Sequence, residues 1–349
     1  MADPLTHPTA SRMHTAAPPG PSARYLLSLG GGVLAALAAF DLLLAGLLAT
    51  GNLPPPAFAN SLCLDEKLNF MRDHPPGVPP DLLVIGSSVA WRQFDGAAVA
   101  AEPLSMKPMN AAFCGLRANQ SVYVANWMLD RYPSVRQVVM IAAPLDFAQC
   151  HNNPDAVFNR RDADAFVYGG ASRWPYYMRY FSPTSLLRNA RKVKNRRAAL
   201  EELEPLVFDA YGDSPLATGA SRPTLFYGKP EPPDAKCYQA LASLAARLQR
   251  HGQQLTVVAT PLHPKWKAME DADGSYRRDF DSRIATVLKT TGAQYWDADR
   301  EWTTPEASFI DAIHLRWTAA QDFSAALARQ LGRRESGPVG DAAHRFPSS

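Results

Sequence analysis

Short apolar runs recur along the chain and alternate with segments of helical period. The runs are rich in Leu, Val, Ile, Met and Ala and are bounded by polar or turn residues, which is typical of strands buried on both faces. The predicted strands are 82–86, 109–113, 138–142, 255–260 and 293–297.

The segments between these runs predict helices. In 234–251, apolar side chains repeat every three or four residues, and Gly252 suits a helix C-terminus. Strands alternating with helices indicate an α/β fold: a doubly wound parallel sheet with helices on both faces. Other predicted helices are one directly after the first strand, 121–130, 279–291 and a closing helix with an apolar face at 319, 323, 327 and 331, ended by Gly332.

The N-terminal region differs from the rest. Residues 1–24 lack an apolar period and predict a disordered tail, whereas Tyr25–Thr50 holds ten leucines and a single charge, Asp41. At 26 residues this stretch is long enough to span a bilayer as a helix. Asp41 is either a polar contact to another membrane protein or a charge tolerated by tilt and local water.

A cleaved signal peptide ending at Ala57-Phe58-Ala59 is the alternative for this segment. We favour an uncleaved anchor, because the apolar region exceeds the roughly 7–15 residues of a signal peptide. Arg12 and Arg24 precede the span, and no Lys or Arg occurs in 51–66. The positive-inside rule then puts the N-terminus in the cytoplasm, so we expect a single-pass protein of the bacterial inner membrane with a periplasmic or extracellular C-terminal domain.

Composition shifts divide the remaining chain. Residues 51–80 carry seven prolines and predict an extended linker. The α/β domain is expected over 81–332, interrupted by a helical insertion at 148–232 that is rich in Arg, Tyr, Phe and Pro. Residues 333–349 predict a second disordered tail.

Charge and cysteine content exclude other classes. A net charge of only +3 argues against a nucleic-acid-binding protein that depends on phosphate contacts. The four cysteines show no CxxC pair and no metal-ligand spacing, so neither a zinc nor an iron–sulfur site is expected. In an oxidising compartment Cys114 and Cys150 could pair, although sequence alone does not fix connectivity.

Three predicted loops share the carboxyl edge of the sheet, where reactive groups collect in open parallel folds. The first strand ends in Ile85-Gly86-Ser87-Ser88, which places a hydroxyl at a strand-to-helix turn with free N–H groups. The second leads to Cys114-Gly115, where glycine lets the backbone approach a bound carbonyl. Before the closing helix, Asp311 precedes His314 by three residues, a spacing at which the carboxylate can orient the imidazole as a base for a serine.

Together these loops resemble the blocks of the SGNH, or GDSL, hydrolase superfamily of esterases and acyltransferases. Gly86-Ser87-Ser88 stands where the family has Gly-Asp-Ser, so the resemblance implies Ser88 as nucleophile. His314 corresponds to the family's base and Asp311 to its orienting acid. The N–H groups of Ser88 and Gly115 would form the oxyanion hole, without a metal or organic cofactor.

The third family block departs from the pattern. The family has Gly-x-Asn-Asp after its third strand, whereas this chain reads Ala143-Pro144-Leu145-Asp146, so leucine replaces an asparagine that donates to the oxyanion. Gly-Ser-Ser with a degenerate third block resembles the membrane-anchored members that modify cell-envelope polymers. The resemblance therefore implies an esterase or O-acyltransferase acting on an envelope polysaccharide or exopolysaccharide, with a membrane-bound acyltransferase as a candidate partner. The alternative is a catalytically weak scaffold that binds a glycan or such an acyltransferase.

Other features have competing interpretations. Gly212-Asp213-Ser214 matches the family's first block literally but follows no predicted strand, so we interpret it as a turn. His263 and Trp91 are weak candidates for substrate binding, each with a structural role as the alternative. Asp146 either braces the active-site loops or caps its turn, and we favour the cap. The basic run 188–197 could contact anionic lipid or polymer, but a solvated helix face is the favoured interpretation.

Overall fold

The computed structural model describes residues 23–103, 105–151 and 153–335, which form two compact units divided after Leu53. The first unit contains helix α1 (Ala23–Ala49). Its segment Tyr25–Ala49 is long and apolar enough to cross a membrane by length and composition. The predicted tail 1–24 lies outside the described residues, except for its last two residues, which begin α1.

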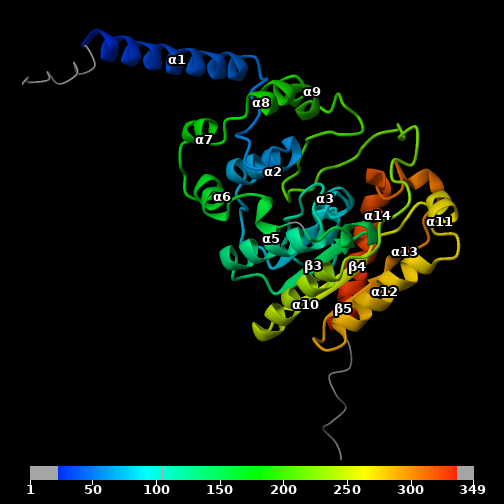
Figure 1. Ribbon diagram of the computed structural model, residues 1–349. Helices are drawn as coiled ribbons and strands as arrows, with labels where there is room; N and C mark the ends of the chain where they lie inside the picture. Colours follow the sequence, from blue (N-terminus) through cyan, green and yellow to red (C-terminus); the bar gives the residue numbers. More distant parts are fainter. Residues whose placement is uncertain (1–22, 104, 152, 336–349) are drawn as a thin grey trace, which may run out of the picture. The chain divides into compact units, whose positions relative to one another are not determined.

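The second unit, from Pro54 onward, is built on a five-stranded sheet in which all neighbouring strands are parallel. The strand order is β2-β1-β3-β4-β5, so the chain switches direction across the sheet after β2. This confirms the predicted doubly wound α/β fold (Figure 1). The strands are β1 (Leu82–Gly86), β2 (Pro108–Asn110), β3 (Gln137–Ala142), β4 (Gln254–Ala259) and β5 (Gln294–Asp297).

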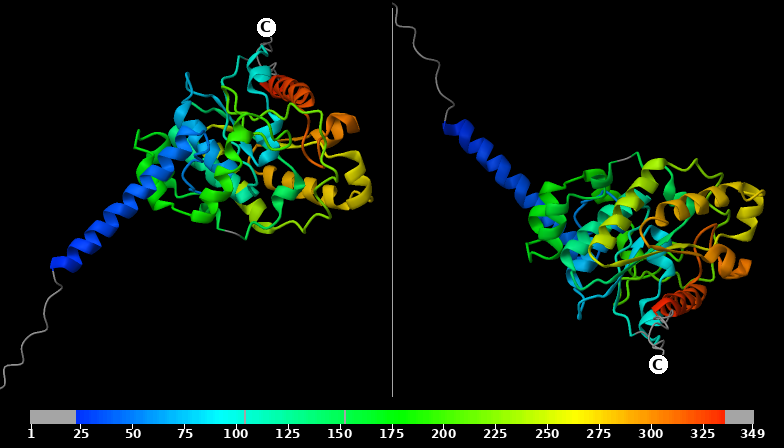
Figure 2. Two further views of the ribbon diagram at one scale, coloured as in Figure 1. Left: turned by 90° about the horizontal axis from the view of Figure 1, so that it is seen from above. Right: turned by 90° about the horizontal axis from the view of Figure 1, so that it is seen from below.

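Successive side chains of the central strands β1 and β3 enter different cores, which explains why these strands are apolar along almost their whole length. Leu83 and Ile85 of β1 join the core under α5 (Ala118–Arg131), α10 (Ala235–Arg250) and α12 (Ser275–Leu288). Leu82 and Val84 join the core under α3, α4 and α14. Figure 2 shows α14 (red) on the opposite side of the sheet from α10 (yellow-green). The helices of the second core are α3 (Ser88–Gln93), α4 (Gly96–Ala100), α13 (Ala298–Glu301) and α14 (Trp317–Glu335).

The closing helix is longer than predicted. It passes through Gly332 and ends at Glu335, so the first three residues of the predicted 333–349 tail are helical. The rest of that tail lies outside the described residues.

The predicted extended linker over 51–80 is wrong. It contains α2 (Leu62–Asp73), whose Leu68 and Met71 are buried in the core of the domain. Phe58 packs against the rings of Phe166, Tyr176 and Tyr180 at 4.7–5.2 Å between centroids. The apolar and aromatic side chains of residues 51–80 therefore pack this segment against the insertion, although prolines flank α2.

The predicted insertion at 148–232 is helical only in its first part. Residues 198–234, which follow the helical part, contain neither helix nor strand. They cross the carboxyl edge of the sheet, where several of their side chains line a hollow beside Ser88. The insertion contains η2 (Pro154–Ala156), α6 (Arg160–Val167), α7 (Trp174–Arg179), α8 (Pro183–Ala190) and α9 (Val193–Arg197). The remaining elements are η1 (Pro144–Phe147), α11 (Pro264–Glu270) and η3 (Glu306–Ser308).

The cysteines pair differently from the Cys114–Cys150 pairing considered above. The disulfides are Cys63–Cys114 and Cys150–Cys237. The sequence did not reveal these pairings, because the two cysteines of each disulfide are 51 and 87 residues apart. The packing of α2, which carries Cys63, and of α10, which carries Cys237, brings them together. Cys63 belongs to the segment that was expected to be a linker.

Candidate active site

The candidate nucleophile stands where β1 turns into α3. Gly86 has φ +145°, and a Cβ placed there would lie 2.3 Å from the carbonyl oxygen of Ile141 on the neighbouring strand. Only glycine can therefore make this turn. Ser87 caps α3, its Oγ accepting from the Val89 N–H at 3.3 Å, and Ser88 is the first helical residue.

Ser88, His314 and Asp311 form one hydrogen-bonded chain, as their spacing predicted. Ser88 Oγ lies 2.9 Å from Nε2 of His314. Nδ1 of the same ring lies 2.9 and 3.0 Å from the two carboxylate oxygens of Asp311. With Nδ1 held by the acid, Nε2 is free to accept the serine proton.

Asp311 is held as an anion. Burial alone would raise its pKa, but the charge and hydrogen bond of His314 and the backbone N–H groups of Ile313 and His314 outweigh burial, so its pKa lies below the usual value. Both N–H groups donate to Oδ1, at 3.0 and 2.9 Å. Arg222, from the irregular part of the insertion, adds an ion pair at 3.3 Å. Asp311 therefore remains a carboxylate that can stabilise a protonated His314.

Side chains and backbone bonds fix the loop that carries the acid and the base. Gln93, at the end of α3, donates to the carbonyl of Ile313 and accepts from Thr260 Oγ1 at 2.7 Å. The N–H of Ala312 donates to Leu225 of the insertion at 3.1 Å. The helix that positions Ser88 is thus bonded directly to the loop that positions His314.

Gly115 lies in the loop after β2, with φ +69°. The adjacent Cys114 ties this loop to the start of α2 through its disulfide with Cys63. Within the described part of the chain, no hydrogen bond from the N–H of Ser88 or of Gly115 to another protein group is observed. Both residues line two hollows that meet at Ser88, so both N–H groups are available to a substrate oxygen.

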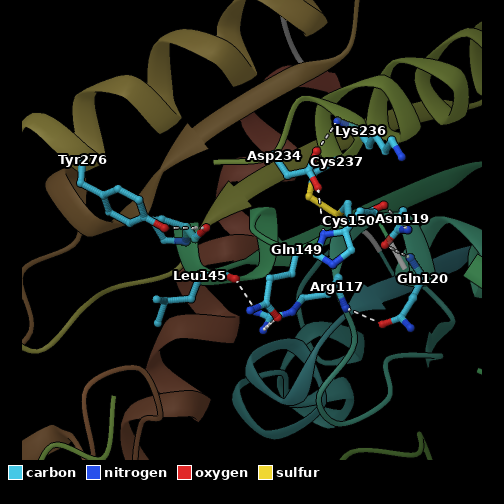
Figure 3. Close-up of a disulfide and its surroundings, with 12 residues drawn as sticks. Arg117, Asn119, Gln120, Leu145, Gln149, Cys150, Asp234, Lys236, Cys237 and Tyr276 are labelled. Atoms are coloured by element: carbon cyan, nitrogen blue, oxygen red, sulfur yellow. Dashed lines mark hydrogen bonds and ion pairs between the residues drawn. A yellow bond between two sulfur atoms is a disulfide. The ribbon is translucent and has the colours of Figure 1, made fainter. Parts of the chain in front are cut away.

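Leu145 lines the smaller hollow, of about 280 Å³, together with Ser88 and Gly115. An apolar side chain therefore stands at the edge where the family pattern has an asparagine. Figure 3 shows Arg117 reaching from the loop after β2 to the Leu145 carbonyl, at 2.7 Å, and to Gln149 Oε1, at 3.1 Å. Arg117 thus bridges the two loops beside the N–H groups of Ser88 and Gly115, a role for which the sequence pattern gives no signal.

Asp146 both caps its turn and braces the site. Its Oδ2 accepts from the N–H of Ala143 at 2.9 Å and from Ser87 Oγ at 3.0 Å. Burial raises the pKa of Asp146 to about 6, while those two hydrogen bonds and the charge of Arg117 oppose the rise. The hydrogen bond between Asp146 and Ser87 therefore joins the turn after β3 to the residue that precedes Ser88.

The two weak candidates for substrate binding have structural contacts. His263 caps α11, its Nδ1 accepting from the Lys265 N–H at 3.1 Å, and its ring lies 5.2 Å from that of Phe309. Burial lowers the pKa of His263. It lines a neighbouring hollow rather than the two at Ser88. Trp91 is buried beside Phe208, but it does line the larger hollow at Ser88, of about 380 Å³.

The literal Gly-Asp-Ser sequence is part of the structural core. Ser214 is fully buried, and its N–H donates to the Trp91 carbonyl at 3.0 Å. Asp213 accepts from the Gly96 N–H and from Asn110 Nδ2, both at 2.7 Å. Asp213 also lies near Asp95 and Asp209, and the buried Lys67, which donates to the Gly212 carbonyl, interacts electrostatically with Asp213 and Asp209.

The basic run contributes ion pairs rather than a uniform patch. Arg196 binds Glu201 and Glu204, and Arg197 binds Glu66 at 2.6 Å. Arg191, Lys192 and Lys194 are exposed, as expected for a solvated helix face.

The structure therefore places a Ser–His–Asp hydrogen-bonded chain at the carboxyl edge of a doubly wound parallel sheet, an arrangement that can activate a serine hydroxyl as a nucleophile. No family model and no curated protein matches the chain. Among solved structures, the chain is similar to an aryl esterase of M. smegmatis (11% identity, TM-score 0.37) and to a carbohydrate acetylesterase of Sinorhizobium meliloti (12% identity, TM-score 0.37). Each similarity covers 72% of this chain and 98% of the other. At such identities the function must be argued from this chain's own residues.

Proposed function

We propose that the protein is a serine-dependent esterase or O-acyltransferase that acts on acyl esters of a cell-envelope polysaccharide. The observation that carries the proposal is the continuous chain from Ser88 Oγ through the His314 ring to Asp311, with both steps at 2.9 Å. A serine in this setting needs no metal or organic cofactor to become a nucleophile.

The reaction follows from the positions of these groups. Ser88 Oγ attacks the ester carbonyl carbon while His314 Nε2 takes its proton, and the N–H groups of Ser88 and Gly115 bind the resulting oxyanion. The tetrahedral intermediate expels the alcohol, which receives that proton from His314. Water or the hydroxyl of an acceptor then attacks the acyl-serine while His314 takes its proton; the bond between the acyl carbon and Ser88 Oγ breaks, and Oγ recovers the proton from His314. Hydrolysis and transfer differ only in the group that attacks in this last step.

Leu145 favours a polymeric substrate over a small one. Because the oxyanion site has backbone donors but no asparagine, small esters gain little stabilisation there. A polymer can compensate through contacts along its length, for which the insertion supplies the wall of the larger hollow. The membrane-competent helix α1 and the two disulfides support a location outside the cytoplasm.

Substituting Leu145→Asn should speed hydrolysis of short nitrophenyl esters about 10- to 100-fold, since it restores one oxyanion donor. The unmodified protein should be slow on these esters and clearly faster on acetylated oligosaccharides. Initial rates on both substrate types test this expectation. Leu145→Ala serves as the control, because it opens the same space without adding a donor. Fast turnover of nitrophenyl esters by the unmodified protein would remove the support for a polymer.

The location has a separate test. Arg12 and Arg24 precede the span, so we expect the C-terminus to lie outside the cytoplasm. A periplasm-specific reporter fused after Ser349 should therefore be active, and a cytoplasm-specific reporter at the same position should be inactive. Activity of a cytoplasm-specific reporter at that position would contradict the envelope assignment and leave the chemistry untouched.

A further inference from the structure

Arg92 lies on the same face of α3 as Ser88, one helical turn further along. It lines the larger hollow, the one that also contains Ser88 and His314. Only 7% of the residue is exposed, so a full guanidinium charge is enclosed beside the candidate nucleophile. Burial lowers the pKa of Arg92 to about 10, which leaves it cationic at neutral pH.

The hydrogen bonds of this guanidinium are incomplete. Nη2 donates to the Pro205 carbonyl at 3.1 Å, and the group lies 4.6 Å from the Trp91 ring centroid. Nη1 is buried and has no hydrogen-bond partner among the described residues. A buried donor without an acceptor costs free energy, and the cost is larger when the donor is charged. Arg92 Nη1 therefore needs an acceptor that the described residues do not supply, such as a group of the substrate.

The other two arginines of the hollow are already compensated. Arg196 binds Glu201 and Glu204, and Arg222 binds Glu204 and Asp311. Arg92 has no ion pair with a carboxylate among the described residues. The residues that line the hollow include three arginines but two carboxylates, Glu204 and Asp311, so its wall carries an excess positive charge, and Arg92 is the arginine without a direct ion pair in the described part of the chain.

We propose that the substrate carries a carboxylate close to the ester and that Arg92 binds it, so that Arg92 determines specificity for anionic substrates. This inference rests on the proposed function of the site. A singly charged carboxylate balances the excess positive charge of the lining residues, whereas a phosphate dianion would bring an excess negative charge toward Glu204 and Asp311. The carboxylate can belong to the acyl group, as in a succinyl ester, or to the sugar, as in an acetylated uronic acid.

The test compares kcat/KM for two matched pairs of probes. One pair is nitrophenyl hydrogen succinate against nitrophenyl butyrate; the other is an O-acetylated methyl glucuronoside against the corresponding glucoside. We expect the anionic member of one pair to be preferred about 10- to 100-fold, and that pair identifies the source of the carboxylate. In Arg92→Gln the preference should fall below about threefold, and Arg92→Lys should retain part of it.

Arg196→Gln is the matched control, because it removes a compensated arginine from the same hollow and should keep the preference. Equal rates within both pairs, or a preference that survives Arg92→Gln, would overturn the inference while leaving the esterase intact. If neither these probes nor acetylated oligosaccharides are turned over, the proposed function fails instead. Calorimetric titration of Ser88→Ala with glucuronate and succinate then decides about Arg92: no binding, or equal binding after Arg92→Gln, overturns the inference.

Discussion

Replacing His314 with alanine is expected to lower kcat for ester hydrolysis by about 10⁴-fold, and Ser88→Ala should have a similar effect because the members of a triad act as a unit. The reason is the 2.9 Å contact between Ser88 Oγ and His314 Nε2, which supplies the only proton acceptor bonded to that hydroxyl in the described structure. Initial rates on an ester that the unmodified protein hydrolyses provide the measurement.

The matched control is His263→Asn, which removes a second histidine from the same region while keeping an acceptor at the N-terminus of α11. It should retain most of the activity. A His314→Ala protein that is folded and within tenfold of the normal rate would show that the Ser88–His314 contact is structural.

The largest expected effect on stability comes from Gly86→Ala. The added Cβ would lie 2.3 Å from the Ile141 carbonyl oxygen and 2.7 Å from the Ala90 Cβ, and alanine does not favour φ +145°. Neither neighbour can move without distorting the sheet or α3, so the free energy of unfolding should fall by about 3–5 kcal/mol.

Urea unfolding checks this loss, with Gly77→Ala as the control. A Cβ at Gly77 meets no atom within 4 Å, so that change should stay within about 0.5 kcal/mol. If Gly86→Ala unfolds at the same urea concentration as the unmodified protein, the turn is not as tight as described.

The sequence predicted the sheet because burial on both faces leaves a clear signal. The runs 82–86 and 138–142 are apolar at every position, and both are strands in the structure. The segment 51–80 was predicted wrongly, since its prolines concealed the apolar positions of α2, of which Leu68 and Met71 are the most informative. Proline content indicates a linker only where no apolar period lies between the prolines.

The site was predictable as far as it depends on local spacing. Asp311 and His314 are three residues apart, and Ser88 follows a strand that ends in glycine. Arg117 and Arg222 were not predictable, because they reach the site from a loop and from an irregular segment without any periodic pattern. Arg92 did leave a signal: a basic residue four positions after the candidate serine shares its helix face.

The central claim is that Ser88 is the nucleophile, and mass-spectrometric mapping of a fluorophosphonate adduct tests it most directly. We expect a single modified peptide with the phosphonyl group on Ser88, and loss of that adduct in Ser88→Ala and His314→Ala but not in Ser87→Ala or Ser214→Ala. An adduct on Ser87 or Ser214, or labelling that persists in Ser88→Ala, would contradict it.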